Sequence, residues 1–193
     1  MSDFLQALYT RRSVKYVQAP GPSQDELSLI LQAAVCAPDH GAVHPWRFKV
    51  VRGADIPMLI DLGIEAGVQA GSPLPEPKIQ NARKWLSKVP LMIAVGCAPD
   101  PRGRIREQES LLSVGAAVMN MLNAAHALGY CGFWSTGMGT YLDGVGEALG
   151  FDTLDMRFMG YVSLGTPIDP LPEKQRPDYR DFVSEWHAAP IAD

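Results

Sequence analysis

The stretch LMIAVGCA, residues 91–98, is a run of eight apolar or small residues directly after Pro90. A short run without charged side chains is typical of a strand that is buried on both faces. The charged segment PDPRGRIREQE, residues 99–109, ends the run and leads into the next apolar stretch. We therefore expect a strand in the interior of the protein at 91–98.

Strands and helices alternate on both sides of this strand, with no internal repeat and no low-complexity tract. That order predicts an α/β or α+β protein. The Pro-rich segment GSPLPEPK, residues 71–78, interrupts the pattern as a surface excursion rather than a domain linker, because neither flank can bury its own core. Further strands are expected at 47–51, 131–136 and 158–165, and helices from residue 3 to the basic residues at 11, from 23 until Pro38, and at 56–70, 78–88, 111–130 and 144–149.

The second of these helices has the clearest beginning. Ser23 is followed three residues later by Glu26, the pattern in which the two side chains cap each other's backbone N–H groups. Leu27, Ile30 and Leu31 follow at helical spacing and form one apolar face. We expect a helix that begins at Ser23 and packs on this face.

Length and composition indicate one globular domain over residues 1–193, since 47% of the residues are hydrophobic and 20% are charged. The net charge of −4 argues against a nucleic-acid partner. Three cysteines without CxxC spacing favour a reducing cytoplasm. The most apolar stretch, 111–130, includes Asn120, Asn123 and His126, so a buried helix is expected there rather than a membrane span.

The common catalytic motifs are absent from the sequence. It contains no GxxxxGK[ST], GxSxG or HExxH, and the glycines of TGMGTYLDGVG do not fit GxGxxG. Asp39, His40 and His44 are close in sequence, but no further carboxylate or cysteine stands at ligand spacing beside them. We expect no metal site.

Four separate segments allow either a structural or a functional interpretation. Cations at the end of a helix oppose its dipole, yet they also attract phosphate. The loop with two histidines can be a packed corner, the small residues after a strand can form only a turn, and a basic tail can serve solubility. The segments are RRSVK (11–15), APDHGAVHPW (37–46), WSTG (134–137) and EKQRPDYR (173–180).

Taken in order, these segments resemble the FMN-dependent nitroreductase family, in particular its small NAD(P)H nitroreductase type. RRSVK, APDH with HPW, a long helix rich in small residues, GFWSTG, YVSLGTP and a KxRP tail span nearly the whole chain. The resemblance implies an α+β fold with a central mixed or antiparallel sheet flanked by helices. It also implies an intertwined homodimer with FMN at the interface, while the net charge and the polar residues of 111–130 predict no nucleic-acid and no membrane partner.

The resemblance also implies roles for residues at both ends of the flavin. Arg11, Arg12 and Ser13 match the segment that binds the phosphate and ribityl chain. Lys15 matches a lysine near the pyrimidine edge, where an ammonium stabilises the charge of the reduced ring. His40 matches a residue that reaches the flavin from the partner subunit.

The remaining matches come from the second half of the chain. A segment beside the isoalloxazine ring corresponds to Trp134, Ser135 and Thr136, and the Gly137 N–H can contribute there. Lys174 and Arg176 align with a pair that grips the phosphate in larger relatives. Two positions depart from the family's pattern: Cys36 stands where small members often have arginine, and we expect a buried, inert thiol there, while His44 replaces the glutamine of QPW.

Hydride from NADH or NADPH would pass through flavin N5 to a flat, electron-poor acceptor such as a nitroaromatic or a quinone, with ping-pong kinetics. No side chain is expected to act as acid, base or nucleophile. Three other interpretations stay open at this point: an FMN store or sensor with little turnover, a different flavin reaction such as dehalogenation or dehydrogenation, and an α/β domain without flavin.

Overall fold

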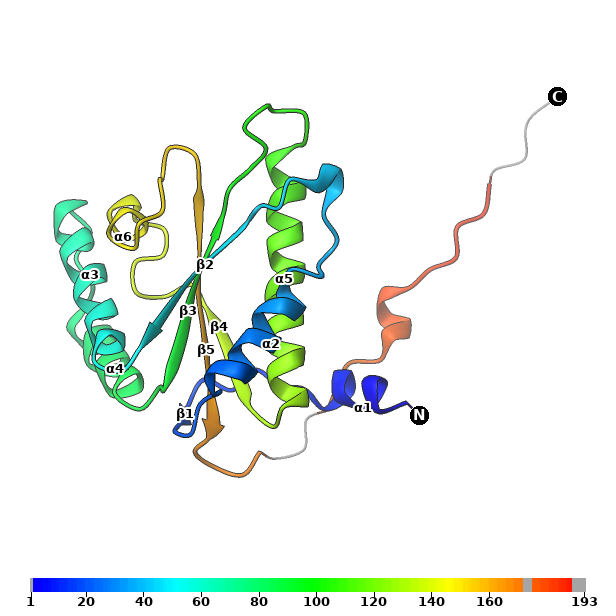
Figure 1. The fold of residues 1–193 in the computed structure, drawn as a ribbon, viewed down its shortest axis with the longest axis horizontal. Helices are drawn as coiled ribbons and strands as arrows, with labels where there is room; N and C mark the ends of the chain where they lie inside the picture. Colours follow the sequence, from blue (N-terminus) through cyan, green and yellow to red (C-terminus); the bar gives the residue numbers. More distant parts are fainter. Residues whose placement is uncertain (1, 172–174, 189–193) are drawn as a thin grey trace.

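The structure is a computed structural model that describes residues 2–171 and 175–188. It contains one sheet with helices on both faces (Figure 1). The helical elements are α1 (Asp3–Thr10), α2 (Gln24–Ala34), η1 (His40–Ala42), α3 (Asp55–Gln69), α4 (Glu76–Leu86), α5 (Glu107–Ala127), α6 (Asp143–Ala148) and η2 (Tyr179–Phe182). The strands are β1 (Val17–Gln18), β2 (Trp46–Arg52), β3 (Leu91–Cys97), β4 (Cys131–Ser135) and β5 (Arg157–Pro167).

All four strand pairings are antiparallel, and β5 takes part in three of them. The strands run β1-β5-β3-β2, and β4 pairs with β5 as well. The β3–β5 register sets Ile93 against Val162, and it shifts by one residue between Val95 and Gly96. Gly160 lies opposite this bulge with φ of 97°, a conformation that favours glycine.

Helices α2 and α5 cover one face of the sheet, and α3, α4 and α6 cover the other (Figure 1). Each face has its own hydrophobic core: Ile93, Val118 and Met121 belong to the first, and Ile60, Trp85 and Tyr161 to the second. Because both faces are covered, every residue of β3 is buried. The expected interior strand at 91–98 is confirmed, and antiparallel neighbours surround it.

The expected helices and strands are all present, with ends that differ by a few residues. Ser23 accepts from the Glu26 N–H while the Ser23 N–H donates to Glu26 Oε2, so the predicted reciprocal cap is confirmed. The helix after it ends at Ala34, four residues before Pro38. Helix α5 begins earlier than predicted, at Glu107, and ends at Ala127 before Gly129 adopts a positive φ.

Within the part of the chain that the structure describes, no helix, α5 included, is both long enough and apolar enough to cross a bilayer. One face of α5 packs on the sheet through Val114, Val118 and Met121. The opposite side exposes Leu112, and a Cβ on Gly115 would meet no other atom within 4 Å. The long helix therefore offers an uncovered apolar side in the single chain.

Candidate functional site

The basic segment at 11–15 begins where α1 ends. Arg11 is the cap residue of α1, and its N–H donates to the Ala7 carbonyl oxygen. The chain is then extended and runs beside β4, with a parallel bridge between Ser13 and Gly132. The Val14 N–H donates to the Gly132 carbonyl oxygen at 2.9 Å. The segment is thus attached to the sheet and does not continue α1 into solvent.

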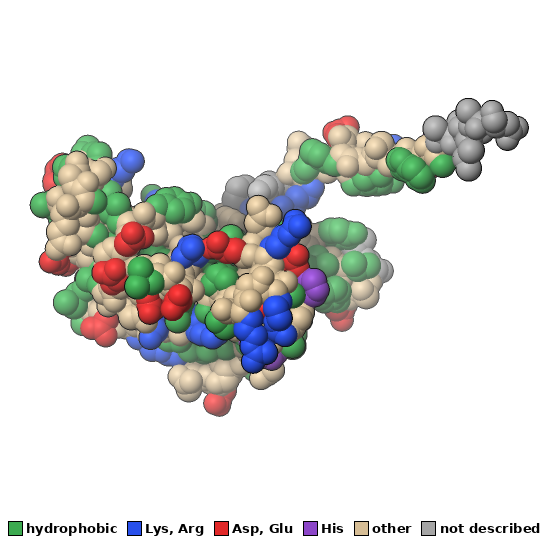
Figure 2. Space-filling model, turned by 90° about the horizontal axis from the view of Figure 1, so that it is seen from above, with side chains coloured by type: hydrophobic (Ala, Val, Ile, Leu, Met, Phe, Trp, Pro, Cys, Tyr) green, Lys and Arg blue, Asp and Glu red, His purple; other side chains and the backbone are tan. Residues whose placement is uncertain are grey.

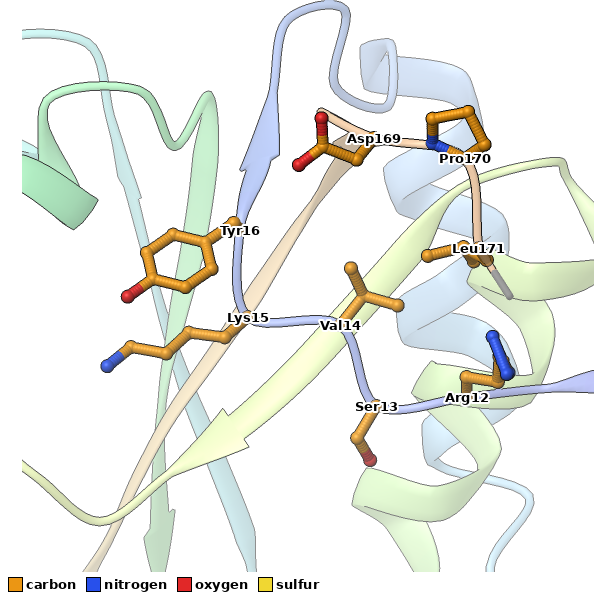
Figure 3. A pocket seen from close by; sticks show the side chains of 8 residues that line it. All are labelled: Arg12, Ser13, Val14, Lys15, Tyr16, Asp169, Pro170 and Leu171. Carbon is orange, nitrogen blue, oxygen red and sulfur yellow. The ribbon is translucent and has the colours of Figure 1, made fainter. Parts of the chain in front are cut away.

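Extended backbone sends successive side chains of this segment to opposite sides. Figure 3 shows Arg12 and Val14 pointing toward Leu171, while Ser13 and Lys15 point away from it. A cavity of about 410 Å³ is lined by residues 12–16 and by Asp169, Pro170 and Leu171. The predicted phosphate and ribityl residues therefore divide between two sides of one strand-like segment.

Arg176 joins the basic segment from the far end of the chain. Its Nη2 donates to the carbonyl oxygen of Arg11 and, at 3.5 Å, to that of Tyr9. Arg11 Nη1 is buried and has no hydrogen-bond partner among the described residues. Burial, and then the charge of Arg176, lower the pKa of the Arg11 guanidinium. The guanidinium groups of Arg11 and Arg176 thus lie close together, and the buried Nη1 of Arg11 has no acceptor in the described part of the chain. Lys174, which was predicted to act with Arg176, lies outside the described residues.

Lys15 lies at the other end of the segment and faces aromatic rings. Its Nζ lies 5.1 Å from the ring centroid of Trp85 and 5.7 Å from that of Tyr16. The Trp85 indole N–H donates to the Lys15 carbonyl oxygen at 2.8 Å. Helix α4 therefore contacts both the backbone and the side chain of Lys15.

The end of β4 is held mainly by its own chain. The Trp134 indole N–H donates to the Met159 carbonyl oxygen at 2.8 Å, and the ring packs against the α2–α5 core. The Gly137 N–H donates to Ser135 Oγ at 3.2 Å, and Thr136 is exposed. In the single chain, the N–H expected to contribute at Gly137 is thus already paired within the turn.

His40 lies far from the basic segment. Its Nδ1 pairs with Glu109 Oε2 in the first turn of α5, and its side chain is 69% exposed. At the other end of α5, His126 Nε2 shares a hydrogen bond of 2.9 Å with Thr10 Oγ1, next to Arg11. Glu109 and His126 are 17 positions apart on this helix, which corresponds to about 25 Å. One chain therefore does not bring His40 to the other predicted residues.

The residues near His40 correct one sequence expectation. The expectation of a buried Cys36 is wrong, because the residue follows the end of α2 and is exposed, with Sγ donating to the Gln32 carbonyl oxygen at 3.3 Å. His44 Nδ1 lies 3.1 Å from Asp39 Oδ2. Over residues 2–171 and 175–188, no group of three or more His, Cys, Asp or Glu side chains is placed to hold a metal ion.

Three residues that the sequence did not single out shape the site. Trp85 contacts Lys15, Glu109 pairs with His40, and Gly160 lies against the Ser135 carbonyl oxygen so closely that a side chain would overlap it. None carried a motif: Trp85 follows Lys84 in a helix that looked merely charged, and the other two contacts join residues far apart in sequence.

The antiparallel sheet between two helical layers, with the basic segment beside β4, defines an α+β fold. The family model described as "Nitroreductase family" matches residues 8–166. The chain belongs to the nitroreductase family.

Individual relatives agree with this assignment. The "Putative NAD(P)H nitroreductase YdjA" of Escherichia coli is 34% identical over 165 residues, covering 86% of this chain and 88% of that protein. A nitroreductase-like family protein from Bacillus cereus superposes with a TM-score of 0.80 at 22% identity, over 97% of this chain and 98% of that one. A "putative nitroreductase in complex with fmn" from Desulfovibrio desulfuricans superposes with a TM-score of 0.74 at 24% identity, over 97% of this chain and 99% of that one.

Proposed function

We propose that the protein is an FMN-dependent oxidoreductase that takes hydride from NADH or NADPH and reduces a flat, electron-poor acceptor such as a nitroaromatic or a quinone. The observation that carries the proposal is the unused, buried Nη1 of Arg11 beside Arg176. Leaving a charged donor buried and unpaired is costly, and a phosphate with its three acceptor oxygens would relieve that cost.

The FMN-bound putative nitroreductase from Desulfovibrio desulfuricans, which shares this fold, supports a flavin as the ligand. An FMN phosphate would bind to Arg11 and Arg176, and the ribityl chain would lie near Ser13, on the side of the segment opposite the Arg12 side chain (Figure 3). Lys15 would face the pyrimidine edge, and residues 134–137 would border the ring. When bound, FMN would supply the redox chemistry by accepting hydride at N5 and passing it on.

The side chains of the protein would bind and orient both substrates without transferring a proton themselves. Donor and acceptor would use the same open side of the site in turn, so ping-pong kinetics are expected. Lys15 would stabilise negative charge that develops at the pyrimidine edge. The three free cysteines suit work in a reducing cytoplasm.

The proposal includes a homodimer, and the separation of the predicted site residues along α5 supports it. An antiparallel arrangement of two α5 helices would bring His40 of one subunit to Arg11 of the other. Apolar side chains are available for such contact: Leu112 is 74% exposed on α5, and Trp186 is 85% exposed on the tail that leaves the body of the molecule (Figure 2). Phe182 on the same tail is exposed as well.

The deciding experiment is the visible spectrum of the desalted protein, followed by anaerobic addition of NADH or NADPH in the same cuvette. Flavin bands that bleach with a reduced nicotinamide are expected, after which nitroaromatics and quinones are screened as acceptors. Bands that persist with both donors would contradict the oxidoreductase and leave a flavin-binding protein. A colourless protein that cannot be reconstituted with FMN would contradict the cofactor itself.

A further inference from the structure

The charge of Lys15 is oriented without being neutralised. The side chain is half-buried, and within residues 2–171 and 175–188 its ammonium makes no ion pair. Its nearest described partner is the face of Trp85, 5.1 Å from Nζ to the ring centroid. A ring face attracts a cation through its quadrupole, whereas a carboxylate would cancel the charge. The ammonium therefore remains available to an anionic group.

Trp85 is itself held rigidly. It lies at the end of α4 and is 3% exposed. Its ring packs edge-to-face with that of Phe133 on β4, with the ring centroids 6.4 Å apart and an interplanar angle of 85°. Its N–H donates to the carbonyl oxygen of Lys15, at 2.8 Å. The same indole thus fixes Lys15 at two points, the backbone and the ammonium, and links both to β4.

We propose that Trp85 is the positioning residue for Lys15: it holds the ammonium toward the pyrimidine edge of the flavin and so favours the reduced cofactor. This rests on the proposed function. It gives α4 a role in the redox properties of the site through the two contacts that Trp85 makes with Lys15. Trp85 acts through Lys15 and touches neither donor nor acceptor.

The test measures the flavin reduction potential and FMN affinity in the holoprotein. Lys15→Met serves as the reference, and it should lower the potential. Trp85→Leu, which removes the ring face and the N–H, should weaken the binding of reduced FMN about tenfold relative to oxidised FMN, equivalent to about 30 mV for a two-electron couple. Trp85→Phe, which keeps a smaller ring face and loses the N–H donor, should lower the potential less and is the deciding variant if Trp85→Leu does not fold.

Each Trp85 substitution is then repeated on the Lys15→Met background. If Trp85 acts through Lys15, it should change the potential no further there, because interacting residues are not additive. Equal shifts in both backgrounds would overturn the proposal and leave Trp85 as a core residue. Trp46→Phe is the matched control: it removes the same atoms from a partly buried tryptophan in the other core and should leave the potential unchanged.

A second readout needs no cofactor. Lysines methylated with ¹³C-formaldehyde and a borane reductant give separate NMR signals, and Lys15→Met identifies the one from Lys15. That signal should be shifted upfield by the Trp85 ring and should lose the shift in Trp85→Leu, and an unshifted signal would overturn the contact. Wild-type protein that fails to bind FMN would defeat the proposed function together with this inference, whereas bound FMN with unchanged potentials would defeat the inference alone.

Discussion

The basic segment at 11–15 and the loop that carries His40 differ in the contacts that they make within a single chain. The first is attached to β4 through Ser13 and Val14 and meets Arg176 from the far end of the sequence. The second lies at the opposite end of α5, where His40 pairs with Glu109 (Figure 1). Both were predicted to bind one cofactor, yet α5 keeps them about 25 Å apart.

The difference shows which part of the proposed site the single chain completes. Strand pairing and the Arg176 contact assemble the phosphate end and the Lys15 end without a partner. The His40 loop has hydrogen bonds of its own and an exposed ring, and in the proposed dimer His40 would reach the site of the partner subunit. The substitution with the largest expected effect changes the contact between β5 and the end of β4.

Gly160→Ala should destabilise the protein by about 3 kcal/mol and displace the end of β4. Its φ is 97°, and the new methyl group would overlap the Ser135 carbonyl oxygen. Gly53→Ala is the matched control, because φ is 56° there and no atom lies within 4 Å of the added carbon. Urea unfolding measures the free energy of unfolding of both variants. Equal losses of stability would mean that the overlap with Ser135 costs nothing beyond the strained backbone conformation.

Arg11→Ala should weaken FMN binding about 10- to 100-fold, the effect of losing one charge-assisted hydrogen bond of about 1.5–3 kcal/mol. Fluorescence titration of the cofactor-free protein measures this affinity. Arg102→Ala, at an exposed position in the loop before α5, is the control and should bind FMN normally. Stoichiometric flavin retained by Arg11→Ala after desalting would contradict the role of Arg11.

His40→Ala should weaken binding about 2- to 10-fold, as expected for a neutral hydrogen bond. Mixing it with Arg11→Ala separates the two regions. If each site takes Arg11 from one subunit and His40 from the other, a mixed dimer has one site with both residues and one with neither. Native affinity should return at half the sites of isolated mixed dimers. Two weakened sites, one with the affinity of Arg11→Ala and the other with that of His40→Ala, would place both residues of a site in one chain.

The smallest effect concerns acid stability at the α1–α5 junction. Burial, and then the charge of Arg11, lower the pKa of His126 in the folded protein. The unfolded chain therefore binds a proton more readily, and the stability gained from neutral His126 is full above the ordinary pKa near 6.5 and is lost as pH falls below it. NMR titration should show the pKa of His126 rising in Arg11→Ala. An unchanged pKa of His126 would contradict the electrostatic effect of Arg11 on this histidine.

Much of the fold could be predicted from local pattern. A buried strand was predicted at 91–98 because this segment is continuously apolar. The helix start at Ser23 was predicted because capping by Glu26 is a contact between near neighbours in sequence. Strand β1 was missed, since two residues carry no periodicity. The earlier start of α5 at Glu107 was missed because its first turn is charged and exposed and so lacks an apolar face.

The candidate site was less accessible from sequence for a physical reason. Motifs indicated Arg11, Lys15 and Arg176, but the contacts that orient them join residues far apart along the chain. The Lys15–Trp85 contact spans 70 positions and produces no motif. The pairing of Ser135 with Gly137 depends on a turn geometry that the letters WSTG do not specify.

The central place of β5 has a consequence for synthesis on the ribosome. Strands β1, β3 and β4 all pair with β5, which is the last strand along the chain. Until residues 157–167 leave the exit tunnel, only β2 and β3 can pair, and apolar strand edges wait without partners. Such edges promote association between nascent chains. The interval before β5 emerges is therefore when this protein most needs chaperones.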